Sequence, residues 1–128
     1  MILLDTHAWI WWAAKSRQLS ASARQAIAGE ARVGLAAISV WEAAMLVEKG
    51  RLTFDRPLEE WIRDALTLPK LEQIPLSPEI AIAAARLGRL HSGDPADWMI
   101  VATAQQHRAK LVTKDRNLRN LNVVATVW

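Results

Sequence analysis

The chain has 128 residues, 52% hydrophobic and 23% charged, a balance that excludes a disordered or fibrous protein and predicts one compact domain over residues 1–128. It contains no cysteine, which excludes disulfides and thiolate metal sites and leaves oxygen and imidazole as the possible metal ligands. The net charge of +3 and the pI near 9.8 favour a polyanionic partner.

The first predicted element is a strand at Ile2–Leu4. This short apolar run has no basic leader before it and no long apolar stretch after it. We therefore expect neither a signal peptide nor a membrane span, and we expect a cytoplasmic protein.

Short apolar runs continue to alternate with amphipathic stretches along the chain. The predicted strands are Ile2–Leu4, Val33–Ala36, Leu71–Ile74, Leu111–Thr113 and Val123–Val127. The predicted helices are Thr6–Ala14, Ala21–Ala28, Val40–Lys49, Leu58–Leu68, Glu79–Leu90 and Ala96–Arg108. This order predicts an α/β fold with a central, mainly parallel β-sheet flanked by helices on both faces.

Boundary residues support these helices. Four residues are predicted as N-caps: Ser20, Ser39, Asp55 and Asp94. Two prolines suit first-turn positions, Pro57 and Pro95, and two glycines suit the C-terminal ends, Gly29 and Gly50.

Two acids follow predicted strands. Asp5 comes directly after Ile2–Leu4, and Asp115 comes two residues after Leu111–Thr113. Taken singly, each acid is explained by a structural role as well as by a role in a site. Asp5 can be a helix cap, and Asp115 can be a turn residue. Ligand sites of open α/β sheets gather at the carboxyl ends of parallel strands, however, so both acids also suit a site.

Two further acids lie in predicted first helical turns. Glu42 follows Ser39 by three residues, the spacing of a capping box, and Asp97 follows Asp94 in the same way. Asp97 also shares a helix face with apolar residues such as Ile100, which directs its carboxylate toward the protein. Capping explains each acid alone, but it does not explain why all four point to one edge of the sheet. Carboxylates gathered there need a counter-ion, and Mg²⁺ or Mn²⁺ suits oxygen ligands.

Read in order, four segments resemble the signature segments of the PIN-domain nucleases: Leu3–His7, Ser39–Glu42, Asp94–Ala104 and Val112–Asp115. The resemblance spans nearly the whole chain and is strongest to the VapC-like toxins of bacterial toxin–antitoxin pairs. It implies a PIN-like fold and a metal-dependent endoribonuclease.

The resemblance also implies roles for particular residues. Asp5, Glu42, Asp97 and Asp115 take the places of the metal-binding acids, whereas Asp94 is assigned first to capping and second to the metal site. Thr6 and Thr113 match supporting residues that position a carboxylate or a water, and His7 is interpreted as structural. The resemblance further implies a homodimer and inhibition by a cognate antitoxin protein.

We expect one or two Mg²⁺ or Mn²⁺ ions to activate a water and to neutralise charge on the scissile phosphate of RNA. The tail from Arg108 onward is basic. The cations predicted to contact the RNA backbone are Lys114, Arg116, Arg86 and Arg89. Trp41 and Trp98, next to two of the acids, are predicted to form walls of the site.

Two other interpretations remain open. Leu4–Thr6 resembles the start of an aspartyl-nucleophile phosphatase motif, but the acid required two residues after Asp5 is replaced by His7. Alternatively, the chain is a non-catalytic regulatory or binding module in which the acids only cap helices.

Overall fold

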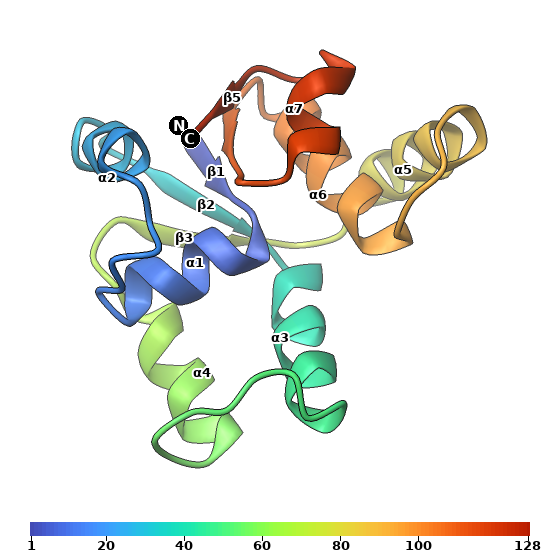
Figure 1. The fold of residues 1–128 in the computed structure, drawn as a ribbon. Helices are drawn as coiled ribbons and strands as arrows, with labels where there is room; N and C mark the ends of the chain where they lie inside the picture. The colour runs from blue at the N-terminus through green and yellow to red at the C-terminus, as the bar shows by residue number, and fades with distance from the viewer.

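The structure is a computed structural model that describes residues 1–128. Its elements are β1 (Ile2–Leu4), α1 (Thr6–Ala13), α2 (Ala21–Ala28), β2 (Val33–Ala36), α3 (Ile38–Glu48), α4 (Leu58–Leu66), β3 (Leu71–Ile74), α5 (Pro78–Leu90), α6 (Pro95–Gln106), β4 (Lys110–Val112), α7 (Arg116–Leu121) and β5 (Thr126–Val127). The strands form one sheet in the order β3-β2-β1-β4-β5, and every neighbouring pair is parallel (Figure 1). The predicted α/β fold is confirmed, and no helix is both long and apolar enough to cross a membrane.

The predicted boundaries differ from the structure mainly near the C-terminus. The first three strands have the predicted bounds, whereas β4 starts and ends one residue earlier and β5 keeps only Thr126–Val127. Helix α7 is absent from the predicted elements, because the residues that follow Asp115 are equally typical of a turn. The Asp115 carboxylate in fact accepts hydrogen bonds from the backbone amides of Asn117 and Leu118, and this N-cap starts a helix.

The predicted caps are correct at two helices and wrong at two others. Ser20 caps α2 and Asp94 caps α6, each accepting a hydrogen bond from a backbone amide. Ser39 lies inside α3, which begins one residue earlier and has no side-chain cap. Asp55 pairs with a neighbouring arginine, and Pro57 itself occupies the cap position of α4 rather than its first turn. The tertiary contacts of Ser39, described below, explain its different role.

The predicted helix ends are confirmed at both glycines. Gly29 is the C-cap residue of α2. Gly50 follows the C-cap residue of α3 with φ of +69°, a left-handed conformation that costs glycine little.

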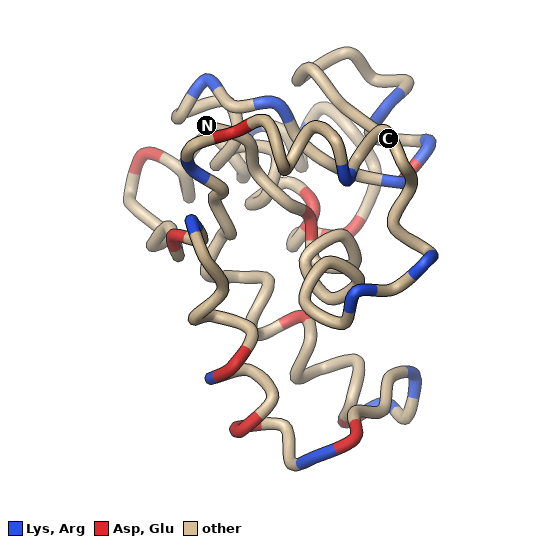
Figure 2. Tube along the Cα trace, turned by 90° about the vertical axis from the view of Figure 1, so that its left-hand side faces the viewer, with Lys and Arg blue, Asp and Glu red and all other residues tan.

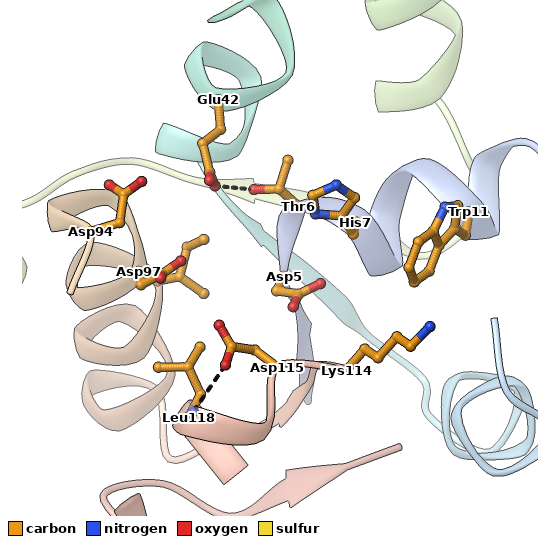
Figure 3. A pocket seen from close by; sticks show the side chains of 11 residues that line it. Asp5, Thr6, His7, Trp11, Glu42, Asp94, Asp97, Lys114, Asp115 and Leu118 are labelled. Carbon is orange, nitrogen blue, oxygen red and sulfur yellow. Dashed lines mark hydrogen bonds between the residues drawn. The ribbon is translucent and has the colours of Figure 1, made fainter. Parts of the chain in front are cut away.

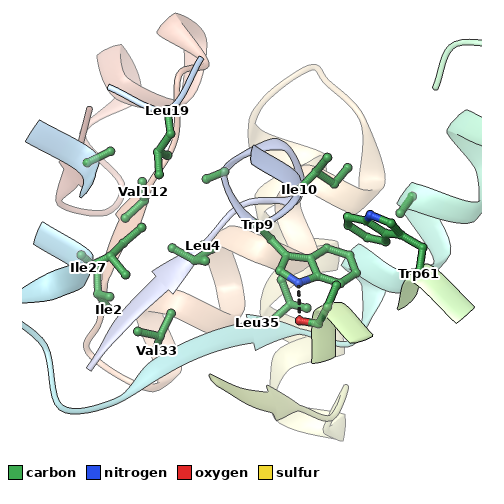
Figure 4. Packing of buried hydrophobic residues seen from close by; sticks show 14 residues of the cluster. Ile2, Leu4, Trp9, Ile10, Leu19, Ile27, Val33, Leu35, Trp61 and Val112 are labelled. Atoms are coloured by element: carbon green, nitrogen blue, oxygen red, sulfur yellow. Dashed lines mark hydrogen bonds between the residues drawn. The ribbon is translucent and has the colours of Figure 1, made fainter. Parts of the chain in front are cut away.

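Each face of the sheet has its own hydrophobic core, because side chains alternate along a strand. Ile2 and Leu4 of β1 pack toward α1, α2 and α4, whereas Leu3 packs toward α5, α6 and α7. Figure 4 shows the first core, where Trp9 is fully buried, meets Trp61 edge-on and donates its indole N–H to the Ala65 carbonyl at 3.1 Å. These contacts fix α1, and therefore the residues at its N-terminus, against the sheet.

The chain path creates a natural site at the carboxyl ends of β1 and β4. After β1 the chain crosses one face through α1 and α2, and it approaches β4 across the other face through α5 and α6 (Figure 1). The connection that leaves β1 and the connection that leads into β4 therefore lie on opposite faces of the sheet. This arrangement leaves a crevice between the two adjacent strands. Asp5 follows β1 directly, and its backbone N–H donates to the Val112 carbonyl of β4 at 3.0 Å.

Candidate active site

A pocket of about 420 Å³ opens at this crevice (Figure 3). It brings together the four acids predicted for the site and the second-tier acid Asp94, which come from widely separated parts of the chain. Its lining consists of Asp5, Thr6, His7, Trp11, Glu42, Asp94, Asp97, Ile100, Lys114, Asp115 and Leu118.

Three of the acids both cap a helix and line the pocket. The Oδ1 atom of Asp5 accepts a hydrogen bond from the Ala8 amide at 2.8 Å at the start of α1. Asp94 and Asp115 do the same at α6 and α7, with distances of 2.9 Å and 2.8 Å to the first backbone amide that each one binds. Each cap leaves a second carboxylate oxygen without a backbone donor. Capping and a place in the site are therefore compatible.

Glu42 and Asp97 line the pocket without capping a helix. The capping box predicted for Glu42 is wrong, because its carboxylate and the Ser39 hydroxyl both contact the Thr6 hydroxyl, at 2.5 Å and 3.0 Å respectively. Thr6 and Ser39 are buried, so this contact ties α1 to α3 and holds Glu42 toward the pocket. No backbone amide hydrogen-bonds to the side chain of either acid.

Thr113 connects the other two acids. Its hydroxyl accepts a hydrogen bond from the Asp115 backbone amide at 3.1 Å, and its proximity to the Asp5 carboxyl group lowers the pKa of that acid. Thr113 is fully buried. Both threonines therefore lie beside acids of the pocket, and their supporting role stays a prediction.

The acids raise one another's proton affinity. Burial raises the pKa of Asp97 to about 7, and the charges of Glu42, Asp94, Asp115 and Asp5 add to the effect in that order. Burial also raises the pKa of Asp5 and of Glu42, against the opposing hydrogen bonds from Thr113 and Thr6. The pocket thus concentrates negative charge where solvent cannot fully screen it.

The opposite wall of the pocket carries aromatic and cationic groups. His7 and Trp11 are one helical turn apart on α1, with ring centroids at 5.5 Å, and the Lys114 Nζ lies 5.7 Å from the centre of the Trp11 ring (Figure 3). The structural role predicted for His7 is therefore incomplete, because its exposed ring lines the pocket. The i, i+4 spacing of His7 and Trp11, directly after Asp5, was the signal that could have identified this wall.

Other predicted residues lie outside the pocket. Trp41 is 54% exposed and does not line it, and Trp98 is buried beside it, so the prediction that both form its walls is wrong. Arg86, Arg89 and Arg116 are exposed but do not line it either. Figure 2 shows lysine and arginine on outer parts of the trace, including the part near the C-terminus. Contact of these three arginines with RNA stays a prediction.

The chemistry of the pocket fits a hard divalent cation. The acidic side chains that could bind a metal are all carboxylates, and a bound cation would relieve their mutual repulsion. As the side chains lie, no three acidic or histidine groups are close enough to hold an ion by themselves. Mg²⁺ does not require such a cluster, because it keeps several waters and binds through one or two protein carboxylates plus substrate phosphate.

Known proteins share this architecture. Ribonuclease VapC22 of Mycobacterium tuberculosis is 39% identical over 119 residues, which cover 93% of this chain and 90% of that protein. A toxin–antitoxin complex from Klebsiella pneumoniae contains a chain that is 25% identical with a TM-score of 0.70, covering 98% of this chain and 97% of that one. VapBC2 from Rickettsia felis, bound to a DNA fragment from its promoter, has the same fold at 17% identity and a TM-score of 0.71, with 98% and 97% covered. The PIN domain family matches residues 2–124, and the chain therefore belongs to the PIN-domain family.

Proposed function

We propose that this chain is a metal-dependent endoribonuclease and the toxin of a toxin–antitoxin pair. A relative of similar length is named as a ribonuclease, and chains of the same fold occur in toxin–antitoxin complexes. The pocket described above supplies the chemistry that such an enzyme needs.

One observation carries this proposal. Glu42 and Asp97 are partly buried acids that cap no helix, yet they line one pocket with three other acids. Burying like charges together costs free energy, as the raised pKa of Asp97 indicates. A purely structural role does not explain why the fold tolerates this cost, whereas a cation-dependent reaction does.

We assign the metal-binding role to Asp5, Glu42, Asp97 and Asp115, with Asp94 as a second-tier ligand. A bound Mg²⁺ or Mn²⁺ supplies neutralisation of the charge that develops on the scissile phosphate and lowers the pKa of water. The Thr6 hydroxyl orients the Glu42 carboxylate, and the Thr113 hydroxyl supports the backbone at Asp115. Lys114, on the opposite wall, attracts the negatively charged RNA backbone next to the acids.

The remaining features of the proposal concern partners and location. We propose that a cognate antitoxin protein binds and inhibits this chain, that the chain forms a homodimer, and that it acts in the cytoplasm. One similar structure is a toxin–antitoxin complex and another is VapBC2, which supports the first of these points.

The two alternatives have less support. The pocket has a histidine where an aspartyl-nucleophile phosphatase requires its second acid. A non-catalytic module accounts for the three capping acids but not for Glu42 and Asp97.

Cleavage of a panel of single-stranded and structured RNAs tests the proposal. We expect purified protein to cut RNA with Mg²⁺ or Mn²⁺ and to lose this activity in excess chelator. A folded Asp5→Asn variant should be inactive in both conditions, which controls for a contaminating nuclease. Equal cutting by both proteins, with and without chelator, would overturn the proposal.

A further inference from the structure

A second pocket shares one edge with the active pocket. Its volume is about 520 Å³, and Asp97, Asp115 and Leu118 line both pockets. Most of the other lining residues come from the loop between α5 and α6 and from α7, whereas Leu90 belongs to the end of α5 and Trp98 to α6. When one chemical group of a ligand binds beside the acids, the adjacent part of the same ligand can therefore lie in the adjoining pocket.

The polar groups of this second pocket are neutral amides and a hydroxyl, together with one imidazole. Apart from the two shared acids it contains no carboxylate, and it contains no lysine or arginine. A phosphate group would find no cationic side chain of the kind that Lys114 offers to the first pocket. A neutral ligand with donors and acceptors along one edge fits better, and an unpaired nucleobase has this character.

Two asparagines are arranged to contact such an edge. Asn117 and Asn120 are three residues apart on α7, so their side chains share one side of the helix. The helix is fixed at its start by the Asp115 cap and ends at Leu121, where the following residue Asn122 has a left-handed φ of +55°. Neither asparagine side chain hydrogen-bonds within the protein, and both residues are exposed. Each amide group can therefore donate and accept hydrogen bonds with a ligand.

The opposite side of this pocket is held in place by close packing around Trp98. The His91 ring lies 5.6 Å from the Trp98 ring, centroid to centroid. Gly93 has φ of +152°, and a Cβ atom there would lie 3.0 Å from the Trp98 ring, so this position requires glycine. The Trp98 Nε1 is the one buried side-chain polar atom without a hydrogen-bond partner. The partly exposed His91 ring is a flat side chain that lines the same pocket as the two amides.

We propose that this second pocket binds an unpaired RNA base next to the scissile phosphate, and that Asn117 and Asn120 determine which base is preferred. This inference rests on the proposed function, because it assumes that the acids cut an RNA strand. Bases in single strands are recognised by hydrogen bonds to their edges and by stacking on flat side chains. The two pockets thus divide cleavage and base recognition between them.

The test compares the double variant Asn117→Ala, Asn120→Ala with the wild-type protein on a single-stranded RNA library of random sequence. Alanine favours the helical state over asparagine, so α7 should remain folded. We expect wild-type protein to prefer one base beside the cut, and this preference to fall by about tenfold in the variant. An Arg119→Ala control on the same helix, outside the pocket, should keep the preference even where its overall rate falls.

A binding measurement separates failure of this inference from failure of the proposed function. Short RNA homopolymers are titrated into metal-free wild-type and variant protein and followed by fluorescence anisotropy. A base preference that disappears only in the double variant supports the inference, even if no cleavage is detected. An unchanged preference in the double variant, or no preference in wild-type protein in either assay, would overturn it.

Discussion

The two adjoining pockets use opposite chemistry although they share Asp97 and Asp115. The first gathers five carboxylates and raises the pKa of Asp97 to about 7. The second carries amide, hydroxyl and imidazole groups with no further acid. Under the proposed roles, carboxylates are concentrated where the phosphate reacts, and the pocket proposed for the base adds no charged carboxylate, lysine or arginine to the two acids that it shares.

The two pockets also differ in how they relate to stability. Clustered and partly buried acids cost free energy unless a cation compensates them. Exposed amides on α7 are solvated and cost little. We therefore expect substitutions in the first pocket to alter the reaction and the metal-free stability together, and substitutions in the second to alter preference alone.

The largest expected effect comes from removing charge at the shared edge. Asp97→Asn keeps the shape of the side chain but removes a proposed metal ligand, so the RNA cleavage rate should fall by at least about 100-fold. The matched control is Asp64→Asn, which changes an exposed acid on α4 that pairs with Arg56, and its cleavage rate should equal that of wild-type protein. A cleavage rate for Asp97→Asn within a few-fold of wild type would remove this residue from the reaction.

A smaller effect should follow from loosening an acid without removing it. Thr6→Val deletes the hydroxyl group that contacts Glu42, and we expect cleavage to fall by about tenfold, as is usual when a residue that orients a metal ligand is lost. Thr6→Ser, which restores the hydroxyl, should recover most of the rate. If serine and valine gave the same rate, the packing of the methyl group rather than the hydrogen bond would be responsible.

The cationic wall should contribute less again. Lys114→Ala removes a charge that faces the acids across the first pocket, and we expect KM for RNA to rise about threefold at low salt with little change in kcat. The difference should shrink as salt is added, because screening weakens the contribution of the lysine. A large fall in kcat that is insensitive to salt would mean that Lys114 contacts the reacting phosphate instead.

The smallest expected effect is on the stability of metal-free protein. The folded-state pKa of Asp97 is about 7 against 3.8 for the free group, so the folded state binds the proton more tightly and its advantage is lost as pH rises through about 7. The raised pKa values of Asp5 and Glu42 act in the same direction. We expect Tm to fall by a few degrees between pH 5 and pH 8, as followed by circular dichroism.

Two comparisons sharpen that measurement. Asp97→Asn should flatten the decrease in Tm with pH, and Mg²⁺ should restore stability to the wild-type protein at pH 8. A Tm that rises over this range, or is unaffected by Mg²⁺, would contradict the proposed repulsion among the acids.

The sheet and most helices could be predicted because local patterns determine them. Buried strands such as Ile2–Leu4 are short apolar runs, and helix α6 has both a capping aspartate and Pro95 at its start. The convergence of acids could also be predicted, because carboxyl ends of parallel strands share one edge.

Other features depend on tertiary contacts that no local pattern reveals. The sequence Ser39 to Glu42 has the spacing of a capping box, but the buried Thr6 hydroxyl takes both side chains as partners. Helix α7 is only six residues long and starts from an acid that also lines the pocket, so its local sequence is equally typical of a turn. The second pocket arises only when α7 meets the loop before α6.

Crystals grown with Mn²⁺ would test most directly whether the acids of the first pocket hold a divalent cation. Anomalous scattering locates manganese independently of any assumption about its ligands. We predict a peak in the first pocket, in contact with carboxylate oxygens of at least two of Asp5, Glu42, Asp97 and Asp115, and no such peak in Asp97→Asn crystals. Manganese bound only elsewhere, at concentrations at which the protein cleaves RNA, would contradict the account.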